Sequence, residues 1–134
     1  MKILADAALV ALGSSLGGLA RWGAATAVSR FSGAVFPFGT FLINVSGSLF
    51  LGWFLTVLSD RLLLSESRWI HPEQLRLLVA VGFTGSFTTF STFEFESYAL
   101  LRDGEGATGL LYIVGSVVVG LIALRMGVQL AQIR

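Results

Sequence analysis

Hydroxyl side chains and phenylalanine rings alternate in one short segment of the chain. Residues 82–93 read Gly-Phe-Thr-Gly-Ser-Phe-Thr-Thr-Phe-Ser-Thr-Phe. Hydroxyl groups donate hydrogen bonds to anions, and the edge of an aromatic ring carries positive quadrupole density. Phe90 and Phe93 are three residues apart, so on a helix both rings point into one seam. This pattern offers an anion several weak contacts and no trapping charge, as ion conduction requires.

The same segment is also compatible with ordinary packing in a continuous helix. Phenylalanine most often contacts lipid or other apolar side chains, and serine and threonine often bond back to their own helix. However, Gly82, Gly85 and the β-branched threonines lower the helix propensity of this segment. A helix that breaks here frees backbone carbonyls, which are good ligands for a hard cation such as Na⁺. Both interpretations stay open at this point.

Other polar side chains interrupt stretches that are otherwise apolar. Asn44 needs hydrogen-bond partners, either in a neighbouring helix or along an ion path. Arg21 either extends to the membrane interface or creates a positive potential that attracts anions. Tyr112 and Ser116 are four residues apart and share one helix face, where they either donate hydrogen bonds to an anion or simply pack.

Little in the sequence favours catalysis or nucleic-acid binding. The chain has no cysteine and one histidine, His71, so it has neither thiol chemistry nor metal-ligand spacing. Glu94 and Glu96 close the phenylalanine segment, and by default they are carboxylates near an interface. The net charge of +1 comes without a basic run. We therefore predict a protein that is not an enzyme and that binds no nucleic acid.

The composition predicts that these residues are positioned by membrane helices. Charged residues make up 13% of the chain, against about 25% in soluble domains. A bilayer core of ~30 Å needs about 20 mostly apolar residues per helix. The uncharged stretches predict one domain, residues 1–134, with four transmembrane spans at about 4–28, 36–58, 75–101 and 107–130.

Small residues recur at spacings that let membrane helices approach closely. Gly13 and Gly17 form a G-x-x-x-G pattern, Ser48 and Gly52 repeat it, and small residues also line the fourth span. They are either helix–helix seams or the ordinary glycine content of membrane helices. Four helices pack around a filled centre, so a conducting protein of this size is expected to be an oligomer.

Positive charges encode the orientation of the chain only weakly. The side of the termini and second loop holds Lys2, Arg61, Arg68 and Arg134, whereas the other side holds Arg30 and Arg102. The positive-inside rule therefore favours cytoplasmic termini by a modest margin.

Three motifs give the sequence a resemblance to a known family. They are Gly17-Gly18-Leu19-Ala20-Arg21, the stretch from Gly39-Thr40 through Asn44 to Gly47, and the segment that ends Thr88-Thr89-Phe90-Ser91-Thr92-Phe93. Together they resemble the Fluc/CrcB fluoride channels over nearly the whole chain, with the spans in the same order.

The resemblance implies a fold, an activity and a set of site residues. The fold is an all-α membrane protein with four transmembrane helices, the third broken, in an antiparallel dual-topology homodimer. It sits in the lipid bilayer of the bacterial inner membrane. The activity is passive passage of fluoride out of the cell through two pores at the dimer interface, around a central structural Na⁺. The implied pore residues are Asn44, Phe90, Phe93, Ser91, Thr92, Glu96, Tyr112 and Ser116; Arg21 lines the vestibule, and the carbonyls of Gly85 and Thr88 hold Na⁺.

The sequence departs from the family pattern in two respects, and two rival functions remain. Glu94 stands where the family commonly has a small polar residue, and the charge bias exceeds what dual topology favours, which leaves a paired second subunit open. A proton-coupled exporter would need a titrating carboxylate at mid-membrane. A non-transporting assembly subunit would need only the helices.

Overall fold

The computed structural model describes residues 1–31, 35–62 and 71–133, which form helices and no strand. The elements in chain order are α1 (Lys2–Phe31), α2 (Phe38–Val57), η1 (Leu58–Leu62), α3 (Pro72–Leu75), η2 (Arg76–Thr84), α4 (Gly85–Phe87), α5 (Phe90–Arg102) and α6 (Gly106–Gln132). The elements η1 and η2 are π-helical, and the N–H of Gly85 accordingly donates to the carbonyl of Ala80, five residues back.

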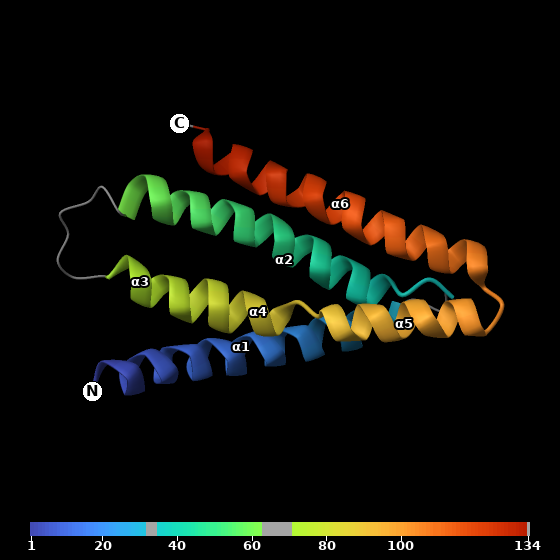
Figure 1. Cartoon of the computed structure of the whole chain (residues 1–134), viewed down its shortest axis with the longest axis horizontal. Helices are drawn as coiled ribbons and strands as arrows, with labels where there is room; N and C mark the ends of the chain where they lie inside the picture. Colours follow the sequence, from blue (N-terminus) through green and yellow to red (C-terminus); the bar gives the residue numbers. More distant parts are fainter. Residues whose placement is uncertain (32–34, 63–70, 134) are drawn as a thin grey trace.

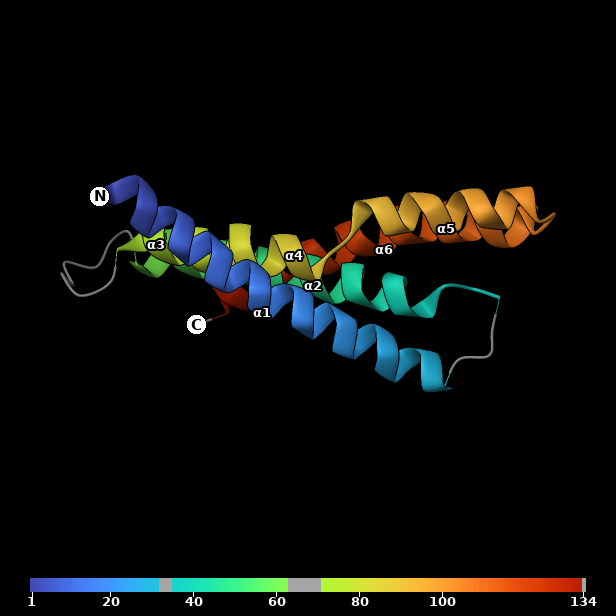
Figure 2. The same cartoon turned by 90° about the horizontal axis from the view of Figure 1, so that it is seen from below.

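The helices lie roughly along one common axis (Figure 1). The chain runs forward in α1, back in α2, forward again through α3, η2, α4 and α5, and back in α6, so both termini lie at the same end. Within this arrangement α1 packs along η2, and α2 packs along α6. Viewed from below, α5 and the start of α6 diverge from the end of α1 and the start of α2 (Figure 2).

Within the described residues, three helical segments are long and apolar enough to cross a membrane. They are Lys2–Arg30, Phe38–Asp60 and Gly106–Gln132, with mean hydropathies of 1.7, 1.8 and 2.3. They fall on the first, second and fourth predicted spans. The predicted third span at 75–101 is built from the shorter elements η2, α4 and α5, and as one membrane span it stays a prediction. Of the residues used to predict orientation, Arg68 and Arg134 lie outside the described residues.

Proline and glycine mark two places where the chain changes direction. Pro72 begins α3, where a missing N–H costs no helical hydrogen bond. Between α5 and α6, Gly104 has a φ of +85°, a conformation that glycine adopts readily because it has no Cβ. This turn sends α6 back along α2.

Small residues allow the helices to touch through their backbones. A Cβ added to Gly13 or Gly17 would meet the carbonyls of Leu78 and Phe83 in η2, and one added to Gly52 would meet the carbonyl of Leu124 in α6. The helix–helix interpretation of these glycines is therefore correct. Gly115 differs, because a Cβ there would meet nothing within 4 Å.

Large apolar side chains cover much of the outer surface. Leu16, Trp22, Leu111 and Leu121 are each more than half exposed, while Tyr112 is fully buried. A soluble protein of this size would hide such residues, whereas lipid or a partner chain accepts them.

Candidate functional site

The helical path is interrupted between α4 and α5. Thr88 (φ −80°, ψ 159°) and Thr89 (φ −147°, ψ 116°) are both extended, and α5 begins at Phe90. The Thr89 hydroxyl caps the new helix by accepting a hydrogen bond from the Thr92 N–H at 3.3 Å. The glycines and β-branched threonines noted in the sequence are those that favour such an interruption.

The interruption removes the helical partners of the carbonyls of residues 85–88, among them Gly85 and Thr88. In a continuous helix the N–H of Thr89 would donate to Gly85, and that of Thr92 would donate to Thr88. Instead, Thr89 N–H donates to Asn44 Oδ1 at 2.8 Å, and Thr92 N–H donates to the Thr89 hydroxyl. The carbonyls of Gly85 and Thr88 are therefore released from the helical ladder.

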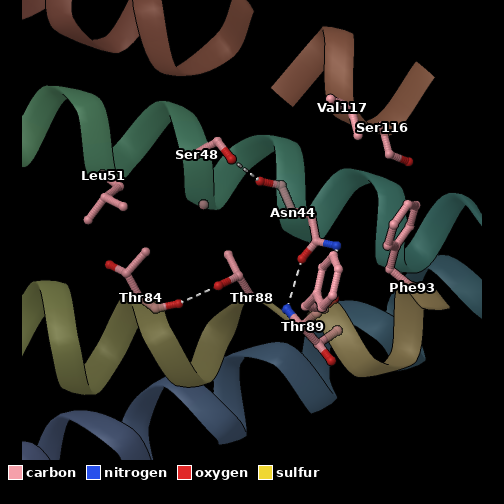
Figure 3. A pocket seen from close by; sticks show the side chains of 11 residues that line it. Asn44, Ser48, Leu51, Thr84, Thr88, Thr89, Phe93, Ser116 and Val117 are labelled. Carbon is pink, nitrogen blue, oxygen red and sulfur yellow. Dashed lines mark hydrogen bonds between the residues drawn. The ribbon is translucent and has the colours of Figure 1, made fainter. Parts of the chain in front are cut away.

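Asn44 on α2 holds the interrupted segment in place (Figure 3). Its Nδ2 donates to the Thr89 carbonyl at 3.0 Å, while its Oδ1 accepts from the same residue. One turn further along α2, Gly47 is buried, and an added Cβ would meet the Thr88 methyl group. Thr88 thus occupies the space left by a missing side chain.

Arg21 reaches the same segment from α1. Its Nη1 donates to the Thr88 carbonyl at 3.3 Å, and the side chain is part-buried. The described chain therefore places this guanidinium against the interruption, and its role in attracting anions stays a prediction.

A pocket of about 280 Å³ opens beside the interruption. Its lining residues are Asn44, Gly47, Ser48, Leu51, Thr84, Thr88, Thr89, Phe90, Phe93, Ser116 and Val117. The Phe90 and Phe93 ring centroids lie 5.9 Å apart, and Phe90 remains 70% exposed. The Ser116 hydroxyl is buried and has no hydrogen-bond partner in the described chain. An unpartnered buried hydroxyl is unfavourable, so a ligand or water is the natural partner.

A second polar group lies behind Phe93. Glu96 accepts hydrogen bonds from the Thr40 hydroxyl at 2.9 Å and from the Tyr112 hydroxyl at 2.7 Å. The Tyr112 ring packs on Phe93 with a centroid distance of 5.2 Å. These contacts join α2, α5 and α6 across the outer part of the bundle.

The structure gathers most, but not all, of the site residues implied by the resemblance. Asn44, Thr88, Phe90, Phe93 and Ser116 line the pocket, whereas Glu96 and Tyr112 lie next to it. Ser91 and Thr92 are exposed on α5 and do not line it, and Gly85 is exposed at the start of α4.

Sequence reasoning missed Thr40, Thr84 and Thr89 as parts of the site. Thr40 stands four residues before Asn44 on α2, and this spacing is a signal that the two share a helix face. Thr84 and Thr89 belong to the hydroxyl-rich segment, in which the spacing did not single them out.

The ion pairs of the described chain lie away from the pocket, near the ends of the helices. Arg76 donates to Glu73 at 2.9 Å, and Arg102 donates to Asp103 at 2.7 Å. Each arginine lowers the pKa of its acidic partner, chiefly through the hydrogen bond. In the described residues, no group of three or more His, Cys, Asp or Glu side chains is placed to hold a metal ion.

Comparison with known proteins agrees with these motifs. A family model described as "CrcB-like protein, Camphor Resistance (CrcB)" matches residues 8–128. The chain is similar to a protein of Synechococcus sp. named "Fluoride-specific ion channel FluC", with 42% identity over 92% of this chain and 90% of the relative. Relatives of the same name from Chloroflexus aurantiacus and Solibacter usitatus are 43% and 44% identical, covering 92% of this chain and 92% and 96% of their own lengths. With its long apolar helices and this match over most of its length, the chain belongs to the CrcB family of multi-pass helical membrane proteins.

Proposed function

We propose that this protein is a fluoride-selective channel that lets F⁻ leave the cell passively and so lowers cytoplasmic fluoride. The observation that carries this proposal is the identity of more than 40% to proteins named fluoride-specific ion channels, across nine-tenths of both chains. The protein is therefore a transport protein of the bacterial inner membrane and not an enzyme.

The pocket beside the interruption is the proposed permeation site. The Ser116 hydroxyl supplies a donor without a competing partner, and Phe90 and Phe93 supply ring edges. In this proposal Asn44 contributes its amide while it also holds the backbone. None of these groups carries a positive charge, so F⁻ binds weakly enough to leave again.

Polar side chains on α5 and α6, three hydroxyls and one carboxylate, extend this site toward the surface. We place Ser91, Thr92, Glu96 and Tyr112 along the path of the ion as it gives up and regains water. The Tyr112 hydroxyl donates to Glu96 in the structure, so in this proposal it serves the ion by exchanging that carboxylate for F⁻. Arg21 supplies positive potential at the vestibule, at a distance that attracts F⁻ without binding it tightly.

One chain leaves the pocket incomplete, which supports an oligomer. Phe90 lines the pocket yet is 70% exposed, and the apolar residues of α6 are broadly uncovered. An antiparallel, dual-topology homodimer would cover these surfaces. Its two-fold symmetry would repeat the pocket and give two pores at the interface. In each copy the third of four membrane spans would then be the broken helix formed by η2, α4 and α5.

Two of the carbonyls released at the interruption, those of Gly85 and Thr88, have the chemistry that a structural Na⁺ needs. Hard cations take about six oxygen ligands, and neutral carbonyls are suitable. The Gly85 and Thr88 carbonyls fit this donor set, and two copies of the chain would together offer four such oxygens. The Thr88 oxygen also accepts the long Arg21 hydrogen bond, but a carbonyl oxygen has two lone pairs. In this proposal the ion joins the two chains at the centre of the dimer.

Fluoride efflux from reconstituted liposomes tests the proposed function. We expect F⁻ to leave down its gradient when a potassium ionophore balances the charge, while Cl⁻ stays inside. A proton gradient should not be required. Uphill cation efflux driven by protons would instead support the exporter. Absence of any flux from a protein that purifies within a larger complex would support the assembly subunit.

A further inference from the structure

One edge of α5 carries an exposed row of side chains that starts at the pocket. Phe90, Glu94 and Tyr98 follow one another at steps of four residues, and Phe90 and Tyr98 are 70% and 60% exposed. The Arg102 guanidinium lies 5.9 Å from the Tyr98 ring centre and continues the row to the end of the helix. The neighbouring face, with Ser97 and Leu100, is buried.

Glu94 is the charged member of this row nearest to the pocket. It follows Phe90 by one helical turn, which is about 6 Å along the axis. It also lies about 12 Å from Arg102 at the helix end, measured in the same way. A carboxylate at this depth is unfavourable against acyl chains.

In the described chain, no positively charged side chain forms an ion pair with Glu94. The side chain is exposed, and the ion pairs of the described residues use Glu73 and Asp103 instead. Its neighbour Glu96, two residues on, turns inward and accepts two hydrogen bonds. Acyl chains offer the Glu94 carboxylate no partner, so in the proposed dimer it must face either water or a group of the second chain.

We propose that the Phe90–Glu94–Tyr98 row borders an aqueous vestibule that leads to the pocket, and that Glu94 limits the rate at which anions enter it. The negative charge lowers the local concentration of F⁻ near Phe90, in opposition to Arg21. The effect of Glu94 on flux rests on the proposed channel function. The exposure of Glu94 to water does not depend on that function.

The first experiment measures access of water to position 94 and needs no transport. The chain contains no cysteine, so Glu94→Cys has a single thiol. We expect a membrane-impermeant methanethiosulfonate to label this thiol in proteoliposomes within minutes. Ser97→Cys, buried at 6% exposure, is the matched control and should stay unlabelled. Failure to label Glu94→Cys in folded protein would overturn the vestibule.

The second experiment measures the effect of the charge on fluoride efflux. We expect Glu94→Gln to raise the efflux rate about two- to fivefold at low ionic strength, and the gain to shrink at high salt because salt screens the charge. Glu105→Gln, which removes the same charge in the turn before α6, is the control and should change the rate little. An unchanged rate for Glu94→Gln at low salt, in a preparation whose wild type conducts, would overturn the role of Glu94. A wild type that does not conduct would refute the channel, while the labelling result would still decide the vestibule.

Discussion

Asn44 binds both backbone groups of Thr89, donating from Nδ2 to the carbonyl and accepting at Oδ1 from the N–H. A residue that leaves a helix at membrane depth must find partners for both its N–H and its carbonyl, because lipid offers none. One amide side chain supplies both at once. This pairing stabilises the extended segment, and it fixes the position of the residues on either side of it.

Replacement of Asn44 by aspartate should disrupt this pairing. A carboxylate cannot donate to the Thr89 carbonyl, so an acceptor is left unsatisfied at a cost of about 1–3 kcal/mol. The new charge also opposes an anion in the pocket by on the order of 3 kcal/mol at an effective dielectric constant of about 20. We expect a lower melting temperature in detergent and fluoride efflux reduced by roughly a hundredfold. Ser46→Ala, whose hydroxyl bonds only to its own helix, is the control. Wild-type efflux in Asn44→Asp would remove Asn44 from the permeation path.

Replacement of Gly47 by alanine should displace Thr88. The added methyl group would collide with the Thr88 side-chain methyl group, and overpacking of this kind costs about 1–3 kcal/mol. Thermal unfolding of the purified protein measures the loss. Gly23→Ala is the control, because a Cβ there meets nothing and alanine favours the helix.

A second substitution makes the Gly47 prediction specific. Thr88→Ser removes the colliding methyl group and retains the hydroxyl that bonds to Thr84. The double variant should therefore recover most of the stability lost in Gly47→Ala. If the stability changes of the two single variants simply add in the double variant, then the residue 47 and residue 88 side chains do not contact each other.

Substitutions of the two phenylalanines of the pocket should differ in their effect on protein stability, but both should lower fluoride efflux. Phe93 packs on Tyr112, so Phe93→Ile should lower both the melting temperature and the fluoride efflux. Phe90 is 70% exposed, so Phe90→Ile should lower efflux while the single chain keeps most of its packing. Phe95→Ile, at 68% exposure on the same helix but outside the pocket, is the matched control. Normal efflux in both pocket variants would refute the proposed pore.

Loss of the Ser116 hydroxyl should affect transport more than stability. Its oxygen is buried without a partner, so Ser116→Ala should change the free energy of unfolding by less than about 0.5 kcal/mol or raise it. Fluoride efflux should fall because the pocket loses a donor. Ser97→Ala removes a hydroxyl that bonds within α5 and should leave efflux near the wild-type rate. The opposite ranking of the two variants would exclude Ser116 as an ion contact.

Removal of sodium should weaken the assembly if Na⁺ joins the chains. Exchange of Na⁺ for the bulky cation N-methyl-D-glucamine should lower the melting temperature and the dimer fraction measured by light scattering. The physical reason is that the Gly85 and Thr88 carbonyls would lose a shared partner. Identical melting in both salts would count against a structural sodium ion.

Long uncharged stretches and small-residue spacing predicted much of the architecture. The long uncharged stretches coincide with α1, α2 and α6, and Gly13 and Gly17 contact η2 as their spacing indicated. Helix propensity alone left the Gly82–Phe93 segment undecided, because glycine and threonine weaken a helix without requiring it to end. The Asn44–Thr89 pairing decides the geometry there, and it joins residues 45 positions apart.

The Thr40–Glu96–Tyr112 network could not be deduced from spacing. Its members come from three helices, and only the packing of α2 and α5 against α6 brings them together. The π-helical form of η2 was likewise not predicted. The sequence contains no established signal for it, and the structure shows only that Gly13 and Gly17 of α1 approach the backbone of η2 closely.

Because α5 starts at Phe90 instead of continuing an existing helix, its macrodipole also starts there. The first turn of a helix carries about half a unit of positive charge on its free N–H groups. The interruption therefore places a diffuse positive end at the Phe90 side of the pocket, built from main chain alone and insensitive to pH. An anion in the low-dielectric interior would meet this fixed field in addition to the potential of the Arg21 guanidinium.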